Sequence, residues 1–126
     1  MIKLLLVALG SAIGGVARYG LSKVISENVA SAFPWGTFAV NIIGCLVIGF
    51  VLGMIDAGIS LSDNARLFLT VGFCGGFTTF STFAHENYLL FSGGHFLTVA
   101  SYAALSFFAG VVMAYAGHIL AMKIAA

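Results

Sequence analysis

A polar, glycine-rich run lies inside an apolar stretch of this chain, and its residue types suit the binding of a small ion. The run covers residues 75–83 and reads GGFTTFSTF. Each glycine costs about 1 kcal/mol relative to alanine in a helix interior, and the Ser and Thr hydroxyls compete for backbone hydrogen bonds. Carbonyl oxygens freed by a break suit an alkali cation, whereas freed N–H groups suit an anion. The run therefore predicts a broken helix with an ion site; the alternative is an unbroken helix that packs through its small residues.

Two phenylalanines in this run and one asparagine elsewhere could contact an anion. Phe80 and Phe83 are three residues apart, so they share a face of a helix that resumes after the break. The edge of a phenyl ring is partly positive and attracts anions, while a cation prefers the ring face. Asn41 supplies an amide donor in a second apolar stretch, with Thr37 four residues earlier on the same face. Taken singly, the two phenylalanines would be core residues and Asn41 would form a hydrogen bond between helices. Together with a broken helix, they favour an ion pathway.

Two charged residues also fall within apolar stretches. Glu86 follows Phe83 by three residues, and acids inside a membrane are costly and usually functional. Near the membrane interface that cost would be small. Arg18 is either an anchor whose side chain extends to the interface or the positive lining of an aqueous vestibule that gathers anions.

The composition indicates what must hold these residues in place. Of 126 residues, 61% are hydrophobic and 7% are charged, whereas about a quarter of the residues of a soluble domain are charged. The net charge of +1 gives no electrostatic footprint for nucleic acid. These values exclude a soluble enzyme, a disordered chain and a nucleic-acid-binding protein. We therefore expect an integral membrane protein.

Four apolar stretches are long enough to cross a hydrocarbon core, which takes about 20 helical residues. We predict transmembrane helices at 4–25, 33–55, 66–91 and 96–122. The loops between them are short, so residues 1–126 are expected to form a single all-α membrane domain. The first apolar pattern runs on beyond a signal-peptide core, which favours a helix that is retained.

Glycine spacing and charge distribution both indicate more than one copy. Gly-x-x-x-Gly pairs allow helix backbones to approach closely, and a single four-helix chain has little interior to bury them. These pairs are Gly10 with Gly14, Gly49 with Gly53, and Gly72 with Gly76. Four spans place three basic residues on one side of the membrane and two on the other, which hardly biases the orientation. An assembly of oppositely inserted copies fits this balance.

The run at 75–83 closely resembles the third-helix signature of the small bacterial fluoride channels, the Fluc or CrcB family. Matching positions in the rest of the chain are Gly14, Arg18, Asn41, Gly44, Glu86, Tyr102 and Ser106. The resemblance therefore covers essentially the whole chain, and its third-span motif is specific. One position departs from the pattern: Gly110, four residues after Ser106, stands where some members carry a hydroxyl residue.

The resemblance implies an antiparallel, dual-topology homodimer whose third helix is broken mid-membrane. Two oppositely inserted copies would form two separate fluoride pores. A structural sodium ion would be held at the dimer interface by backbone carbonyls that match Gly75 and Thr78 in each copy. The implied partners are the second copy, the transported fluoride and the lipid bilayer, and the implied location is the inner (plasma) membrane, crossed several times.

The resemblance also implies roles for individual side chains. Phe80 and Phe83 would turn their ring edges toward fluoride, and Asn41 matches the pore asparagine. Arg18 matches the basic residue of the vestibule. The remaining polar pore positions match Thr37, Ser81, Thr82, Glu86, Tyr102 and Ser106.

The implied function is a fluoride-selective channel, not an enzyme, that exports cytoplasmic fluoride by passive electrodiffusion. Such a pore must replace the water around a small, strongly hydrated anion with donors and ring edges, yet hold it weakly enough for exit. The alternative is a small proton-coupled multidrug exporter, which has a similar length and four helices. That class relies on a carboxylate deep in its first span, and residues 4–22 contain no acid.

Overall fold

Long apolar segments with few helix-breaking residues form the helices of the computed structural model, which describes residues 1–126. Three spans are single helices: α1 (Ile2–Asn28), α2 (Trp35–Asp56) and α6 (Phe96–Ala125). The third span is divided into α3 (Asp63–Leu67), the π-helix η1 (Phe68–Cys74), α4 (Gly75–Phe77) and α5 (Ser81–Ser92). There are no strands, and the four spans are long and apolar enough to cross a membrane. The prediction of an all-helical, multi-pass membrane protein is confirmed.

Local residues explain where these helices begin and end. The side chain of Ser62 accepts a hydrogen bond from the backbone N–H of Ala65 and so caps the start of α3. Pro34 stands just before α2, where its missing N–H breaks no helical hydrogen bond. The turns after α2 and α5 contain Gly58 and Gly94 with φ angles of 92° and 81°, a conformation that favours glycine. The start of α3 and the ends of α2 and α5 therefore lie where the chain supplies a cap or a turn residue.

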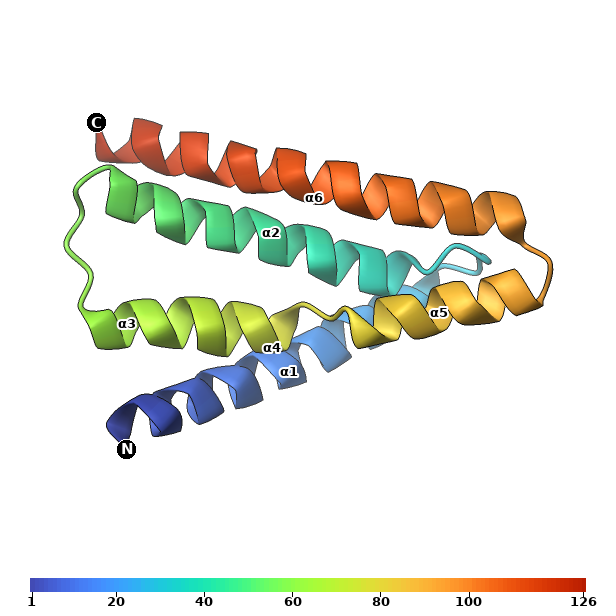
Figure 1. Cartoon of the computed structure of the whole chain (residues 1–126), viewed down its shortest axis with the longest axis horizontal. Coiled ribbons are helices and arrows are strands. Elements are labelled where there is room, and N and C mark those ends of the chain that lie inside the picture. The colour runs from blue at the N-terminus through green and yellow to red at the C-terminus, as the bar shows by residue number, and fades with distance from the viewer.

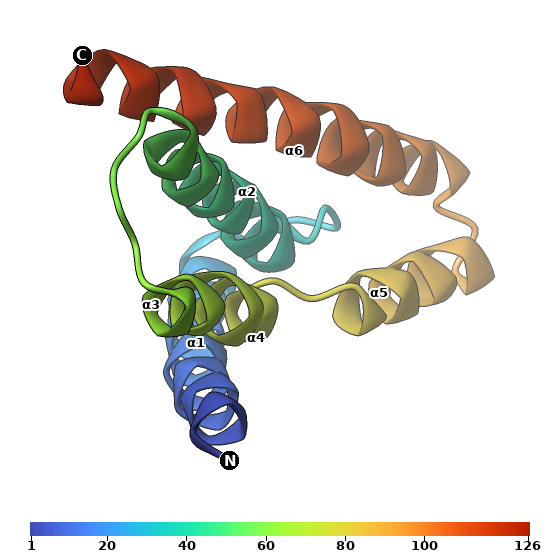
Figure 2. The same cartoon turned by 60° about the vertical axis from the view of Figure 1, so that its left-hand side comes forward.

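Glycines set the distance between neighbouring helices of the chain. The expectation that one chain has little interior to bury its Gly-x-x-x-Gly pairs is wrong, because Gly10, Gly14, Gly49, Gly53 and Gly72 are all buried within it. Helix α2 packs along α6, and a Cβ added at Gly49 would meet the backbone carbonyl of Ala114. Helix α1 packs against η1 and α4, where Cβ atoms added at Gly14 or Gly76 would meet backbone of the facing helix. Figure 1 shows α2 running beside α6, with α1 crossing the third span, and Figure 2 shows the same arrangement from the side.

The third span is interrupted between α4 and α5. Thr78 has an extended backbone, with φ −91° and ψ 159°, and helical structure resumes at Ser81. Figure 1 shows the two halves joined by a short irregular segment. The third span is therefore interrupted, and the alternative of an unbroken helix is wrong; that the break lies at mid-membrane depth stays a prediction. The preceding π-helical turn was not predicted.

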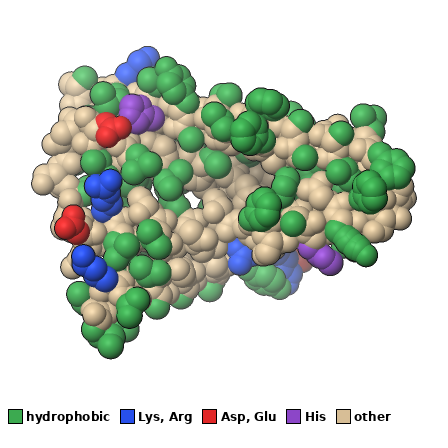
Figure 3. Space-filling view, viewed as in Figure 1, with side chains coloured by type: hydrophobic (Ala, Val, Ile, Leu, Met, Phe, Trp, Pro, Cys, Tyr) green, Lys and Arg blue, Asp and Glu red, His purple; other side chains and the backbone are tan.

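The chain buries little of its own surface. Only 16 of 126 residues are buried, and large apolar side chains are exposed along every span. In Figure 3 they spread over the visible face, with several charged side chains toward the end that carries the termini. Such a surface suits contact with lipid or with another apolar protein surface.

Candidate functional site

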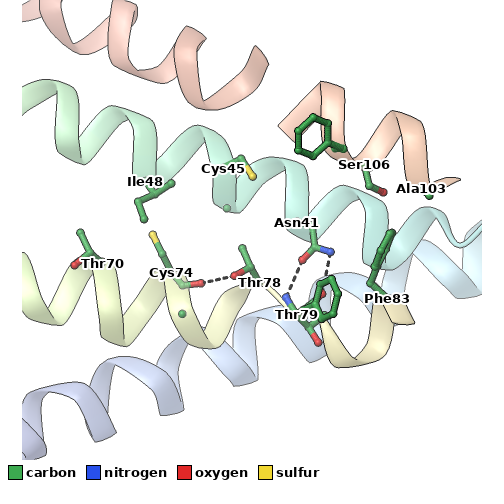
Figure 4. A pocket seen from close by; sticks show the side chains of 14 residues that line it. Asn41, Cys45, Ile48, Thr70, Cys74, Thr78, Thr79, Phe83, Ala103 and Ser106 are labelled. Atoms are coloured by element: carbon green, nitrogen blue, oxygen red, sulfur yellow. Dashed lines mark hydrogen bonds between the residues drawn. The ribbon is translucent and has the colours of Figure 1, made fainter. Parts of the chain in front are cut away.

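Asn41 of α2 holds the irregular segment of the third span. Its Nδ2 donates to the carbonyl oxygen of Thr79 at 3.1 Å, and its Oδ1 accepts from the Thr79 N–H at 2.8 Å. Figure 4 shows this pair of bonds beside the cavity. The amide of Asn41 keeps one N–H that makes no protein contact. Asn41 was predicted to donate to an anion, and one of its two amide N–H groups remains free to do so.

Arg18 of α1 reaches the same break from the other side. Its Nε donates to the carbonyl oxygen of Gly76 at 3.1 Å. The positively charged guanidinium group of Arg18 thus lies at the carbonyl end of α4, where the helix dipole favours positive charge. The other guanidinium nitrogens make no hydrogen bond to protein, so Arg18 keeps donors that can attract anions.

Two carbonyl oxygens at the break accept no hydrogen bond. The Cys74 oxygen accepts from the N–H of Thr78 at 3.0 Å and from its Oγ1 at 2.9 Å. The oxygens of Gly75 and Thr78 have no such partner. Gly75 is exposed, and a Cβ added there would meet only one atom, the Thr70 oxygen, at 3.9 Å. These two oxygens are suitable ligands for a hard cation.

A cavity of about 580 Å³ lies between α2, the third span and α6. Asn41, Gly75, Thr78, Phe80, Phe83 and Ser106 are the predicted site residues that line it. No charged side chain contributes to its lining, although the cavity contains amide, hydroxyl and thiol groups. The structure therefore gathers residues from three spans around one largely uncharged cavity, shown in Figure 4.

The two phenylalanines lie side by side after the break. Their ring centroids are 5.8 Å apart with an interplanar angle of 41°. Phe83 also packs against Tyr102, with centroids 4.8 Å apart. Phe80 is 78% exposed, so the chain leaves most of this cavity-lining ring uncovered.

Glu86 is held by two hydroxyl groups from different helices. Thr37 Oγ1 of α2 donates to Glu86 Oε2, and the Tyr102 hydroxyl of α6 donates to Glu86 Oε1, both at 2.9 Å. Tyr102 is fully buried and Thr37 nearly so. The predicted polar residues Thr37, Glu86 and Tyr102 thus form one cluster, outside the cavity lining.

Two buried polar atoms have no hydrogen-bond partner: Ser106 Oγ and Asn87 Oδ1. Ser106 lines the cavity, and its hydroxyl is buried without a partner. Ser81 is exposed at the start of α5, and the Thr82 N–H donates to Thr79 Oγ1 at 3.3 Å. Sequence reasoning assigned no role to Asn87 or Thr79, although both are polar residues within or next to the run at 75–83.

The two cysteines belong to the cavity wall, and Gly110 packs beside one of them. Cys45 and Cys74 are free thiols that line it, and no cluster of His, Cys, Asp or Glu suits a metal ion. A Cβ added at Gly110 would stand 3.3 Å from Cys45 Sγ. A hydroxyl residue at this position would therefore require Cys45 to move.

The chain is similar to known proteins over nearly its whole length. Residues 5–118 match the family described as CrcB-like protein, Camphor Resistance (CrcB). A protein of Chloroflexus aurantiacus named "Fluoride-specific ion channel FluC" is 41% identical over 117 residues, which covers 93% of each chain. Proteins of the same name from Chlorobium phaeobacteroides and Bacteroides fragilis are 45% and 43% identical; they align with 93% and 95% of this chain and with 90% and 96% of their own lengths.

Proposed function

The chain belongs to the CrcB-like family of membrane proteins, and from this premise we propose that it is a fluoride channel, not an enzyme, that exports cytoplasmic fluoride by passive electrodiffusion. The observation that carries the proposal is an identity of 41–45%, across at least nine tenths of each chain, to proteins named fluoride-specific ion channels. The uncharged cavity beside the interrupted span supports it.

The chemistry of the cavity suits a small anion that must pass without being trapped. Phe80 and Phe83 offer ring edges, Asn41 keeps one free amide N–H, and the Ser106 hydroxyl has no other partner. These neutral groups replace hydrating water without fixing the ion as a buried cation would. Thr37, Ser81, Thr82, Glu86 and Tyr102 extend the proposed polar path beyond the cavity. Arg18 would gather fluoride at the entrance through its free guanidinium nitrogens.

The proposed assembly is an antiparallel homodimer in the inner (plasma) membrane, with a pore on each side. The small buried fraction of the protomer and the exposed Phe80 ring support a second copy. The break falls near the middle of the Asp63–Ser92 span, which supports a position at mid-membrane depth. Irregular backbone is tolerated there only against protein or a water-filled space.

We also propose a structural sodium ion between the copies, held by the carbonyl oxygens of Gly75 and Thr78 from each protomer. Both oxygens lack hydrogen-bond partners and Gly75 is exposed, so the residues fit the ion. When bound, the cation would neutralise the negative ends of these peptide dipoles.

Fluoride efflux from liposomes that contain the purified protein tests this function. We expect rapid efflux of fluoride, measured with a fluoride electrode, and no comparable efflux of chloride from matched vesicles. Protein-free liposomes give the baseline. Lack of fluoride-selective efflux, together with proton-driven movement of an organic cation, would contradict the channel and support the exporter.

A further inference from the structure

We propose that Asn41 and Thr79 are positioning residues that create the cation site by diverting the two N–H groups that would otherwise occupy the carbonyl oxygens of Gly75 and Thr78. The inference rests on the sodium site proposed above. It explains why the carbonyl oxygens of Gly75 and Thr78 lack hydrogen-bond donors. The side chains of Asn41 and Thr79 would act on these oxygens indirectly, by binding their helical donors.

The first diversion frees the Gly75 oxygen. In a continuous α-helix the N–H of residue i donates to the carbonyl of residue i−4, so the Thr79 N–H would donate to Gly75. In this structure it donates instead to Asn41 Oδ1 at 2.8 Å. Asn41 Nδ2 also bonds the Thr79 oxygen at 3.1 Å, so the whole Thr79 peptide is anchored to α2.

The second diversion frees the Thr78 oxygen. The Thr82 N–H would donate to Thr78 in a continuous helix, but here it donates to the side chain of Thr79, with 3.3 Å between N and Oγ1. No other N–H replaces it at the Thr78 oxygen. A threonine hydroxyl at a helix start commonly accepts such a bond.

The carbonyl oxygen of Gly76 shows that the break does not leave every nearby carbonyl oxygen free. Its helical donor would be the Phe80 N–H, yet this oxygen is occupied by Arg18 Nε at 3.1 Å. The carbonyl oxygens of Cys74 and Gly76 are therefore occupied by a named donor, whereas the helical donors of the Gly75 and Thr78 oxygens bond elsewhere. Close packing supports the arrangement, because a Cβ added at Gly44 of α2 would collide with the Thr78 side chain.

Sodium-dependent assembly of Thr79 variants tests the proposal. Thr79→Val removes the Oγ1 acceptor and returns the Thr82 N–H to the Thr78 oxygen, where it competes with the cation. Thr79→Ser keeps the acceptor. The dimer fraction is measured by single-molecule photobleaching in bilayers, with sodium titrated against N-methylglucamine. We expect Thr79→Val to raise the half-saturating sodium concentration about tenfold, and Thr79→Ser to stay within twofold of wild type.

Two further variants separate this role from general packing. Asn41→Leu has nearly the same volume and should raise the half-saturating sodium concentration at least as much as Thr79→Val does. Ser11→Ala is the matched control, because Ser11 Oγ donates from α1 to the Gly72 oxygen, upstream of the break. We expect its sodium response to equal that of wild type.

The outcomes distinguish the two proposals. If wild type assembles with sodium but Thr79→Val behaves as Thr79→Ser does, the diversion is wrong and the sodium site stands. A wild-type protein whose assembly ignores sodium would overturn both. If Thr79→Val does not fold, Asn41→Leu decides: a raised half-saturating sodium concentration supports the diversion, and one equal to that of wild type overturns it.

Discussion

Replacing Tyr102 by phenylalanine removes one hydroxyl group from a fully buried side chain and keeps the ring. The hydroxyl donates to Glu86 Oε1 at 2.9 Å, and this oxygen has no other partner. The ring contacts with Phe83 and Phe33, whose centroids lie 4.8 and 5.2 Å away, do not depend on the hydroxyl. The variant therefore isolates one hydrogen bond to a carboxylate between α6 and α5.

The loss can be estimated from the environment of this bond. Hydrogen bonds between helices in membranes contribute about 0.6 kcal/mol on average and about 1.7 kcal/mol at most. Removing the donor leaves Glu86 Oε1, which is part-buried, without its one hydrogen-bond partner. We expect Tyr102→Phe to lower the free energy of unfolding by about 1.5 kcal/mol, about a tenfold change in the unfolding equilibrium constant.

Reversible unfolding in mixed micelles measures this change through the fluorescence of Trp35, the only tryptophan. Its ring lies 4.4 Å from that of Phe33, which in turn packs on Tyr102. Tyr115→Phe is the control, because Tyr115 is 68% exposed and donates no hydrogen bond; its effect should stay within about 0.5 kcal/mol. Equal effects of the two variants would refute the reasoning. So would a Tyr102→Phe effect that persists unchanged in a Glu86→Ala background.

Three further outcomes follow from the packing and the cavity. Gly49→Ala should lower the free energy of unfolding by about 1–3 kcal/mol, because its Cβ meets the Ala114 carbonyl. Gly20→Ala, whose Cβ meets nothing, should not lower it in the same assay. Phe80→Ile should slow fluoride efflux from liposomes while the dimer persists on size-exclusion chromatography; unchanged efflux would remove Phe80 from the pore. Gly75→Ala has room in the protomer and should leave helicity by circular dichroism unchanged, yet weaken sodium-dependent dimerisation. Loss of helicity would contradict that expectation.

The number and approximate position of the spans could be predicted from the sequence, because crossing a membrane depends on the length of apolar stretches. The helices extend a few residues beyond the predicted limits at most ends. In α1, predicted as 4–25 and observed as Ile2–Asn28, Lys23 and Glu27 form an ion pair at 3.9 Å within the last turns. The limit of a span predicted from hydropathy falls where polar residues begin. The helix itself continues until its backbone hydrogen bonding stops.

The partners of individual side chains could not be predicted. Spacing placed Thr37, Glu86 and Tyr102 on three spans, but nothing in the sequence states that both hydroxyls meet one carboxylate. Likewise, Asn41 was expected as an anion donor, and the structure adds its two bonds to Thr79. These contacts depend on how α2, α5 and α6 are packed, and Gly49 and Gly117 set the spacing between α2 and α6.

The sequence by itself determined a helical membrane protein, a break at the run GGFTTFSTF and a family resemblance, because apolar length, helix propensity and motif identity are local properties. Only the tertiary structure decided which peptide groups at the break are satisfied and which remain free. A carbonyl such as that of Gly75 is left open when its helical donor finds a better-placed acceptor on another helix. That choice depends on distances between segments far apart in the chain, so it exists only once the helices have packed.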